Sequence, residues 1–530
     1  MDNTRTVDVA ILGGGLAGNL LARQLRRQCP DLSVALFERT TEGSWKVGES
    51  TVEIACNYFI RRLGLTKYLY EHQLPKNGLR FYFDTPEKNT SLFDMTEIGS
   101  RHLLRLPTFQ IDRARFDTDL QAMNRKDGVD LHLGARVHDL QMGGGPDAHH
   151  AFTVTEGDTS THWRCRWLVD ASGRASLVAR HLDLRTHNPD LPIASVWGRF
   201  RNFADMDDIG PPQWRARIQH TARMLSTNHF CYPGYWIWFI PLGRDVMSVG
   251  WVGEQKQFSD AWRKPEGFLD MLKSHRAVWQ LLKEGEAELL DVLAYKHLAY
   301  GTTRFFRGED RWFLIGEAAA FPDPFYSPGS DFIALEADFI SDMIARDRAG
   351  EPRAAIAERS DTYDAFMQFR LQAALLLYRD VYSLFGSHEL LRLKWDFDIA
   401  CYYNLWTAMY FNDQHLDLRF LQGELRRKDF VLQALANFTR FFKHIEQALV
   451  ERGAYYRKNL GKFVCSLDLV DFMDDIFAPR PRKEVLRTTE AIFNATRDRG
   501  MALLREIGAP LQRTDPHLPL YEFMLEEPLA

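Results

Sequence analysis

Cysteine is scarce in this sequence of 530 residues: six are present, at positions 29, 56, 165, 231, 401 and 465, and no two form a Cys-x-x-Cys pair. Without such spacing the sequence offers neither a disulfide framework nor a zinc site, and we expect no bound metal. Isolated thiols of this kind are typical of a reducing cytoplasm, which is the location we expect.

Long runs of one charge or of apolar residues are also missing. The net charge is −5 and no long basic run occurs, which argues against a nucleic acid partner. The apolar stretch 373–385 is interrupted by Arg379 and Asp380, and none approaches the roughly 18 apolar residues of a membrane span. Residues 1–5 are polar, so we expect no signal peptide and no membrane partner.

Hydrophobic residues make up 45% of the chain, and 36 phenylalanines and 13 tryptophans are present. This composition is typical of a soluble globular protein with an aromatic-rich interior. The length exceeds what one core usually supports, so two or three substructures are expected.

The first 45 residues have the pattern strand, glycine-rich turn, helix, strand, acid. An apolar run at 7–12 leads into Gly13-Gly14-Gly15-Leu16-Ala17-Gly18, a helix at 19–25 and a strand at 34–37 that ends at Glu38. Gly13 allows a tight turn, Gly15 lets backbone approach a pyrophosphate, and Gly18 lets the helix pack on the strand. Glu38 can accept a hydrogen bond from a ribose hydroxyl. The pattern predicts a bound dinucleotide; a plain strand–turn–helix is the alternative.

The rest of the chain predicts an α/β protein with a second sheet and a helical C-terminal region. Strands are expected at 79–83, 131–137, 235–240, 246–252 and 311–315, and a hairpin at 152–156 and 162–169. Residues 84–107 suggest a loop with edge strands, and 143–148 a turn. Helices are expected at 54–63, from Asp112 as N-cap through Leu120, and at 332–348, 354–377, 380–391, 395–409, 429–452 and 483–507.

Four pieces together resemble the FAD-binding domain of the single-component flavin hydroxylase superfamily. They are the glycine turn with Glu38, Asp112-Arg113, Asp170-Ala171-Ser172-Gly173-Arg174, and Gly316-Glu317-Ala318-Ala319, where the superfamily usually has Asp in place of Glu317. The resemblance implies bound FAD and the following contact residues: Gly13, Gly15, Ala17, Gly18, Glu38, Arg39, Gly48, Ser50, Arg113, Val137, Asp170, Gly316 and Glu317.

Three further motifs resemble the flavin-dependent halogenases. Trp236-Ile237-Trp238-Phe239-Ile240-Pro241 matches their WxWxIP signature, Lys76 before the strand 79–83 looks like their catalytic lysine, and 323–329 looks like their halide loop. Side chains at alternate strand positions share a face, so Trp236 and Trp238 could wall the flavin from an organic substrate. The family implies halide contacts at Ser327, Gly329 and Ser330, and a substrate contact at Tyr326.

The resemblance implies a Rossmann-like FAD-binding domain with an associated substrate-side β-sheet and a helical C-terminal region. The expected division is 1–80 for the FAD-binding βαβ unit and lysine turn, 81–107 for substrate-side strands, 108–190 for continued FAD binding, 191–300 for the substrate-side sheet, 301–349 for FAD binding and the halide loop, and 350–530 for the helical region.

The implied activity is FADH2- and O2-dependent halogenation, with chloride or bromide, of an electron-rich aromatic. The family's route passes through a flavin hydroperoxide, hypohalous acid and the lysine, here Lys76. The substrate could be phenolic, pyrrolic or indolic, free or bound to a carrier protein. Since only one dinucleotide motif is present, a separate flavin reductase is the expected partner. The oligomeric state is left open, a homodimer included.

Two departures from the family narrow these expectations. Tyr326 stands where free-tryptophan halogenases have a glutamate, which argues against free tryptophan as the substrate. Pro328 has no N–H to offer a halide, so Gly329, Ser330 or another donor must do so.

Several alternatives remain open from the sequence alone. The chain could be an aromatic hydroxylase or a catalytically silent flavin-binding protein. Trp236 and Trp238 could be ordinary core, Lys76 a solvated turn residue, and Arg80 a second exposed charge. His229 could line the same cavity or be structural, and the C-terminal aromatics could form a helical core or a substrate cap.

Overall fold

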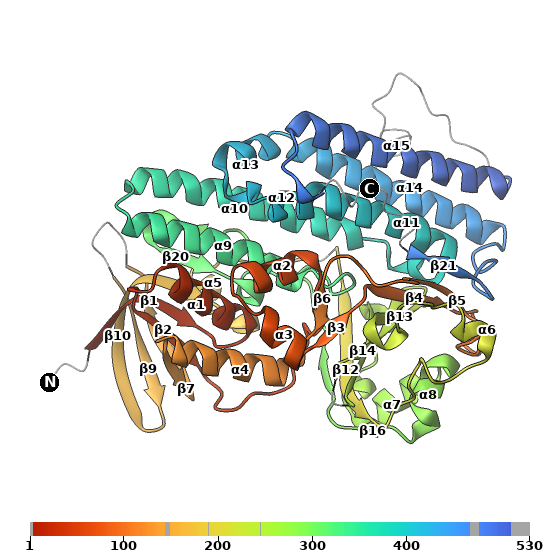
Figure 1. Ribbon diagram of the computed structural model, residues 1–530, viewed down its shortest axis with the longest axis horizontal. Helices are drawn as coiled ribbons and strands as arrows, with labels where there is room; N and C mark the ends of the chain where they lie inside the picture. The colour runs from red at the N-terminus through yellow and green to blue at the C-terminus, as the bar shows by residue number, and fades with distance from the viewer. Residues whose placement is uncertain (1–3, 144–148, 189, 244, 467–475, 510–530) are drawn as a thin grey trace.

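A computed structural model describes residues 4–143, 149–188, 190–243, 245–466 and 476–509. Two β-sheets lie beside one another, and long helices from the C-terminal part of the chain form a layer across them (Figure 1). Most of the turn expected at 143–148 lies outside the described residues. No helix in the described ranges is long and apolar enough to cross a membrane.

The first sheet is the Rossmann-like one that the sequence predicts, in the order β19-β20-β10-β1-β2-β7. Its parallel strands are β1 (Thr4–Leu12), β2 (Val34–Glu38), β7 (Asp130–Leu133), β10 (Thr159–Asp170) and β20 (Trp312–Leu314). Antiparallel β19 (Phe306–Arg307) pairs with β20 and forms one edge. β9 (His150–Glu156) pairs antiparallel with β10, and β8 (Ala135–Gln141) pairs antiparallel with β9. Since parallel strands end at the same edge, the loops after β1, β10 and β20 lie together.

One strand prediction in this sheet is wrong. The segment 131–137 is divided between β7 and β8, which separate at Gly134. Gly134 has a φ of +72°, a backbone conformation that favours glycine, and it redirects the chain from pairing with β2 to pairing with β9. The expected hairpin at 152–156 and 162–169 is confirmed as β9 and β10.

The second sheet has the order β16-β12-β15-β14-β13-β4-β5-β21, with β17 also on β12. Its strands are β4 (Leu79–Phe83), β5 (Thr96–Gly99), β12 (Ile193–Arg201), β13 (Thr227–Tyr232), β14 (Tyr235–Pro241), β15 (Met247–Glu254), β16 (Glu288–Leu289), β17 (Leu293–Tyr295) and β21 (Phe463–Cys465). The edge position expected between 84 and 107 is wrong for β5, because β21 arrives from the C-terminal region and pairs with it.

The interior position of β4 also rules out the alternative that Arg80 is a second exposed charge. Arg80 is completely buried, because β4 lies between β13 and β5. Its guanidinium donates to Glu97 on β5 at 2.7 Å and to the Ser100 carbonyl at 2.7 Å. Burial of this charge is therefore compensated by an ion pair across the sheet.

Two small antiparallel pairs and several short helices connect the sheets. The pairs are β3 (Leu74–Lys76) with β6 (Thr108–Gln110), and β11 (Arg185–His187) with β18 (Tyr300–Thr302). The helices before residue 330 are α1 (Leu16–Gln28), α2 (Glu53–Arg61), α3 (Thr66–His72), α4 (Arg113–Lys126), α5 (Leu177–His181), α6 (Pro212–Arg215), α7 (Pro265–Lys273) and α8 (Arg276–Leu281). Asp112 caps α4 as predicted, accepting from the N–H groups of Ala114 and Arg115.

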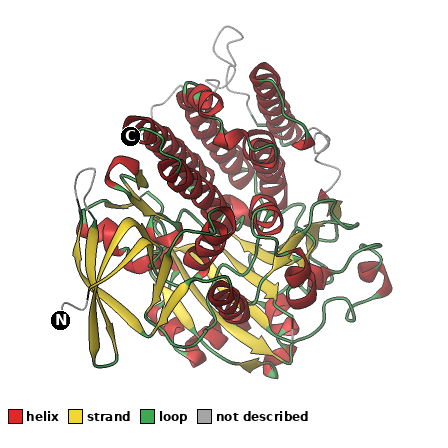
Figure 2. Cartoon of the chain, turned by 60° about the vertical axis from the view of Figure 1, so that its left-hand side comes forward, coloured by secondary structure: helices red, strands yellow, loops and turns green. Residues whose placement is uncertain are grey.

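The helical layer begins at α9 and stands above both sheets in the view of Figure 2. It contains α9 (Gly329–Arg348), α10 (Arg353–Tyr378), α11 (His388–Cys401), α12 (Ala408–Phe411), α13 (Leu418–Leu425), α14 (Lys428–Glu451) and α15 (Arg482–Glu506). The helix expected at 380–391 is wrong: Asp380 has a φ of +58° and breaks the chain after α10. The helix expected at 395–409 spans the end of α11, a π-helical turn at Tyr402–Thr407 and α12.

Candidate active site

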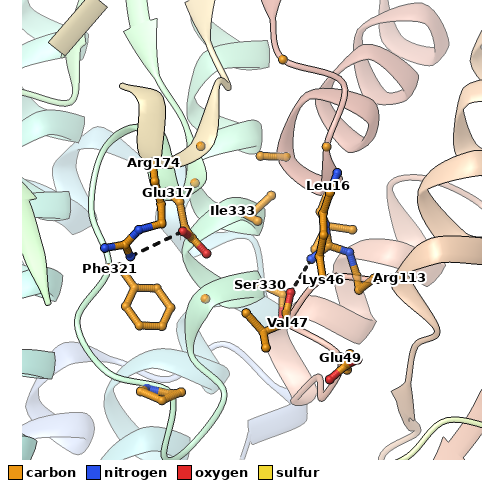
Figure 3. Close-up of a pocket in the computed structure, with 18 of the residues that line it drawn as sticks. Leu16, Lys46, Val47, Glu49, Arg113, Arg174, Glu317, Phe321, Ser330 and Ile333 are labelled. Atoms are coloured by element: carbon orange, nitrogen blue, oxygen red, sulfur yellow. Dashed lines mark hydrogen bonds and ion pairs between the residues drawn. The ribbon is translucent and has the colours of Figure 1, made fainter. Parts of the chain in front are cut away.

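A cavity of about 810 Å³ opens where the ends of β1, β10 and β20 meet the second sheet. It is lined by the glycine turn, by the loop after β10 and the turn after β20, by 44–50, by the two tryptophans of β14, and by the start of α9. Figure 3 shows Leu16 of α1, Arg113 of α4, Glu317 of the turn after β20, and Ser330 and Ile333 of α9 around it. Residues as far apart in the sequence as Leu12 and Ile333 thus build one site.

The glycine turn after β1 has the geometry that the motif predicts. A Cβ on Gly13 would lie 2.2 Å from the Ala171 carbonyl, and one on Gly18 would lie 1.9 Å from the Gly13 carbonyl. Nothing lies within 4 Å of a Cβ built on Gly15, so that backbone faces open space in the cavity. Gly13 and Gly18 permit close packing, and Gly15 leaves a cradle of the kind a pyrophosphate fills.

Glu38 and Arg113 line the same cavity from two sides. Glu38 accepts hydrogen bonds from the Gly14 N–H at 2.8 Å and from the Thr40 N–H at 2.9 Å, which fixes its carboxylate at the end of β2. Arg113 forms a bidentate pair with Asp117, at 2.9 Å for both bonds. It also donates to the Val47 carbonyl at 2.8 Å (Figure 3). These hydrogen bonds within the chain hold the Glu38 carboxylate and the Arg113 guanidinium in position on the cavity wall.

Most of the cofactor contacts implied by the resemblance line this cavity, whereas two lie behind it. Those on the wall are Gly13, Gly15, Ala17, Glu38, Arg39, Gly48, Ser50, Arg113, Val137, Gly316 and Glu317. Gly18 packs inside the turn. Asp170 is buried, and its carboxylate accepts from the N–H groups of Ser172 and Val178, so it shapes the loop after β10.

Glu317 lines the cavity next to Arg174, with 4.0 Å between its Oε2 and Nη1 of Arg174 (Figure 3). The longer carboxylate at this position is thus engaged with a cation on the loop after β10. Gly316 has a φ of +62°, and a Cβ built on it would lie only 2.9 Å from the Ala17 methyl group. This close approach joins the turn after β20 to α1.

The tryptophans of β14 form the wall between the cavity and the second sheet. Both line the cavity, with ring centroids 5.7 Å apart, while Ile237 and Phe239 pack into the core on the opposite face. The Trp238 indole N–H donates to Ser248 at 3.1 Å. A Cβ on Gly250 would lie 2.3 Å from the Trp238 ring, so the indole lies flat against the backbone of β15. The alternation expected from the sequence is confirmed.

His229, on β13 beside this wall, also lines the cavity. Its Nδ1 is 3.1 Å from the Arg80 carbonyl, and its ring stacks on Phe81 with centroids 4.9 Å apart. Burial lowers the pKa of His229 to about 3, so the imidazole is neutral at physiological pH. It contributes a neutral aromatic surface.

The start of α9 faces the cavity with Ser327, Gly329 and Ser330 on the lining. Ser327 has a φ of +57°, and Pro328 is the N-cap residue. In the described part of the chain, the N–H groups of Gly329 and Ser330 have no acceptor, and the buried Ser330 hydroxyl has no partner. Free N–H groups at the start of a helix of 20 residues attract anions.

Lys76 lies one side chain beyond the cavity wall. It is 5% exposed and at the end of β3, and its ammonium donates to the Ser50 hydroxyl at 2.9 Å and to the Thr51 carbonyl at 2.7 Å. Ser50 itself lines the cavity and is 2.8 Å from the Thr227 hydroxyl. The solvated-turn alternative for Lys76 is therefore wrong: the ammonium is buried and has one N–H left to donate.

Burial lowers the pKa of Lys76 from 10.5 to about 8, and the negative field of Glu53 opposes part of that shift. Glu53 begins α2, is 8% exposed and accepts from the Tyr403 hydroxyl at 2.8 Å through Oε1. Its Oε2 has no hydrogen-bond partner among the described residues. The sequence reasoning missed Glu53, because its partner lies 350 residues away on the π-helical turn.

A second missed pair lies under the cavity floor. Glu49, which lines the cavity, accepts from the Arg199 guanidinium at 2.7 and 3.1 Å, and both side chains are almost completely buried. Arg199 also pairs with Asp291 at 3.2 Å. The resemblance predicted cofactor contacts at Gly48 and Ser50 but assigned no role to Glu49 between them.

Tyr326, expected to contact substrate, does not line this cavity. Its hydroxyl donates to Asp398 on α11 at 2.7 Å, and Asp398 also accepts from the buried Lys394 at 2.6 Å. The ring packs beside Trp395, with centroids 5.6 Å apart. Tyr326 thus faces the helical layer, and its role toward a substrate stays a prediction.

The residues of the cavity fit FAD. The open backbone at Gly15 suits a pyrophosphate, Glu38 suits a ribose hydroxyl, and Arg174 and Arg113 supply positive charge to phosphates. The volume of about 810 Å³ lies within the range of cofactor sites.

Comparison with known proteins gives the same assignment. The family model described as "FAD binding domain" matches residues 6–330. Flavin-dependent halogenase chlA of Dictyostelium discoideum is 27% identical over 442 residues, covering 77% of this chain and 71% of that protein. The 1H-pyrrole-2-carbonyl-[peptidyl-carrier protein] chlorinase of Pseudomonas fluorescens is 27% identical over 349 residues, covering 61% of this chain and 72% of that protein.

Solved structures share the fold along almost the whole chain. Halogenase PltM superposes with a TM-score of 0.64 at 17% identity, covering 95% of this chain and 96% of its own. The myxobacterial chondrochloren halogenase CndH has a TM-score of 0.56 at 22% identity, covering 71% and 84%. The resemblance expected from the sequence is confirmed, and the match over 6–330 places this chain in the FAD-binding domain family, among relatives that are flavin-dependent halogenases.

Proposed function

We propose that this protein is an FAD-dependent halogenase that places chlorine or bromine on an electron-rich aromatic ring. The observation that carries the proposal is the position of Lys76 behind Ser50, which lines the cofactor cavity and accepts a hydrogen bond from the Lys76 ammonium at 2.9 Å. A hydroxylase must bring its substrate to the flavin itself, whereas a reactive lysine outside the cofactor cavity suits a small reagent that leaves the flavin. The curated relatives named as halogenases support the same reading.

When bound, reduced FAD with O2 supplies the oxidation of halide to hypohalous acid. The halide is held by the free N–H groups of Gly329 and Ser330 and by the Ser330 hydroxyl, since these donors face the cavity at a positive helix end. A separate flavin reductase supplies the reduced cofactor. The protein acts in the cytoplasm.

Lys76 receives the hypohalous acid at the far side of the wall. Its remaining N–H donates to the oxygen of that molecule and holds the halogen against one ring carbon. As the carbon–halogen bond forms, the halogen–oxygen bond breaks with its electron pair on oxygen, and the ammonium proton converts the departing hydroxide to water. The halogen is thereby reduced and the ring carbon oxidised, with no further co-reactant.

Glu53 takes the proton that the ring carbon loses. Its Oε2 is free and its Oε1 is held by Tyr403, so the carboxylate stays oriented beside the lysine. The proton then returns from Glu53 to the Lys76 amine, which restores both groups. The substrate class consistent with this chemistry is a phenol, pyrrole or indole, free or bound to a carrier.

The direct test combines the purified protein, FAD, a flavin reductase with NADH, and chloride or bromide with a panel of phenols, pyrroles and indoles. Mass spectrometry should detect products with the halogen isotope doublet. A product heavier by one oxygen would instead identify a hydroxylase. No product from free or carrier-bound rings, despite bound FAD, would identify a silent flavoprotein.

The pH profile tests the protonation state of Lys76. Because its pKa is lowered to about 8, the ammonium is lost above pH 8 and not only above 10.5. We expect the single-turnover rate with pre-reduced FAD to fall about tenfold per pH unit above 8, since the donor and the proton disappear. Flavin reoxidation without substrate is the control. A rate that rises through pH 8 would mean that the neutral amine reacts.

Glu53→Gln tests the proton acceptor. The amide keeps an oxygen for Tyr403 but cannot take a proton, so we expect the turnover rate to fall about 10²-fold with FAD affinity unchanged. A substrate deuterated at the reacting carbon should show a larger isotope effect in the variant, because proton removal becomes slow. An unchanged isotope effect would assign the proton to another group.

A further inference from the structure

Arg370 stands out among the buried arginines of the helical layer. It lies on α10, is 5% exposed and has its guanidinium between two aromatic rings. The guanidinium carbon is 4.0 Å from the ring centroid of Trp406, on the π-helical turn, and 5.5 Å from that of Phe332, on α9. Phe332 lines the cofactor cavity on its other side. Arg370 is thus one ring away from that cavity.

The guanidinium of Arg370 is without a polar partner. In the described part of the chain it makes no hydrogen bond and no ion pair within 4.0 Å, and its Nε is fully buried and unsatisfied. The other deeply buried arginines are paired: Arg80 and Arg223 with Glu97, and Arg199 with Glu49. Buried charges are normally paired, so a missing partner requires an explanation.

Asp331, the acid that acts electrostatically on Arg370, does not pair with it among the described residues. Asp331 on α9 already accepts from the Ala55 N–H at 2.9 Å and from the Tyr402 hydroxyl at 2.8 Å. Asp331 acts electrostatically on both Arg370 and Lys76, so both cations lie near this carboxylate. Burial lowers the pKa of Arg370 only to about 10, so it remains a cation at neutral pH. Arg370 therefore belongs to the surroundings of the reactive lysine.

We propose that Arg370 binds a carboxylate on the aromatic substrate, so that the enzyme acts on a free aromatic acid. This inference rests on the proposed halogenase function and names its substrate class. A guanidinium presents its N–H groups as a planar fork that matches two carboxylate oxygens. Because Trp406 and Phe332 lie beside the guanidinium, a carboxylate would bind to the N–H groups at its edge. The π-helical turn that carries Trp406 and Tyr402 is of a kind often found at functional sites.

The burial of Arg370 distinguishes a free acid from a carrier-bound substrate. With 5% of the residue exposed, the guanidinium can meet a small planar group that enters with the ring. The phosphate of a carrier-protein arm is bulkier, tetrahedral and connected to a second protein, which needs an open channel to the surface. A carboxylate attached to the ring enters with the substrate and needs no such channel.

The test uses Arg370→Met and Arg370→Lys in the FAD-loaded full chain. The substrates are a hydroxybenzoic acid and its methyl ester, a pair that differs only in the anionic group. For Arg370→Met we expect KM for the acid to rise about 30-fold and KM for the ester to change less than threefold. Arg370→Lys should recover part of the loss. The variant should unfold at the same temperature or higher, since an unpaired buried charge is removed.

Binding without turnover separates this inference from the proposed function. Calorimetry of benzoate with the wild-type protein should show binding that Arg370→Met loses, whether or not any ring is halogenated. Benzoate binding of this kind with no halogenated product would retain the carboxylate site and overturn the halogenase proposal. Equal losses for acid and ester, or loss of bromide or phosphate binding in place of benzoate binding, would overturn the carboxylate site.

Discussion

Lys76→Met should abolish ring halogenation while leaving the protein folded and loaded with FAD. We expect the yield of halogenated product to fall about 10²- to 10⁴-fold, the range for loss of a positioned proton donor. FAD affinity should not change, because Lys76 lies behind Ser50 and outside the cofactor cavity. The methionine is close in length to the lysine and fills the buried site without a charge.

The variant should still oxidise halide. Without Lys76, no ammonium group would bind the hypohalous acid formed in the cavity, and it would diffuse into solution. A soluble thiol added to the reaction should therefore be oxidised by it. Lys46→Met is the matched control: Lys46 lines the cavity, and its side chain is 40% exposed beside Asp117. That variant should keep halogenation and alter FAD affinity at most. Ring halogenation by Lys76→Met within tenfold of wild type would remove Lys76 from the mechanism.

Glu97→Gln should cause the largest loss of stability of any single substitution discussed. Glu97 is completely buried and receives Arg80 at 2.7 Å, Arg223 at 3.0 Å and Arg217 at 3.5 Å. Burial alone would raise the pKa of Glu97, but these three guanidinium groups hold it below its ordinary value. Loss of the carboxylate leaves buried cations uncompensated, which costs about 3–5 kcal/mol of unfolding free energy.

Urea unfolding followed by tryptophan fluorescence would measure this loss. The matched control is Glu71→Gln, because Glu71 pairs with Lys67 at 3.8 Å with the two side chains 51% and 84% exposed. An exposed pair of this kind contributes less than about 1 kcal/mol. If the two variants lost equal stability, the buried cluster would not hold the second sheet together.

Predictions from the sequence succeeded where a short segment contains its own physical reason. The glycine turn, the Asp112 cap and the alternation of Trp236 and Trp238 each depend on residues a few positions apart. The expected strand at 131–137 failed within such a segment, because strand periodicity does not show that Gly134 has a positive φ.

Other features depend on partners far away in the chain. The burial of Arg80 was not evident because its partner Glu97 lies 17 residues away, and Arg223, which shares that carboxylate, lies 126 residues from Glu97. Glu53 and Arg370 also contact residues that are distant in the sequence: Glu53 contacts Tyr403, and Arg370 lies between Phe332 and Trp406. Only tertiary packing brings these groups together, so charge and burial at these positions could not be inferred from local pattern.

The pairing of β21 with β5 determines how far the chain can be shortened. Residues 463–465 come after four long helices, yet they complete the sheet that carries Trp236 and Trp238. A fragment ending near residue 345 would retain the glycine turn but expose the backbone of β5 as an unpaired edge, which invites aggregation. The helical third is therefore an integral part of a single folding unit, and a minimal cofactor-binding module cannot be excised from this protein by trimming its end.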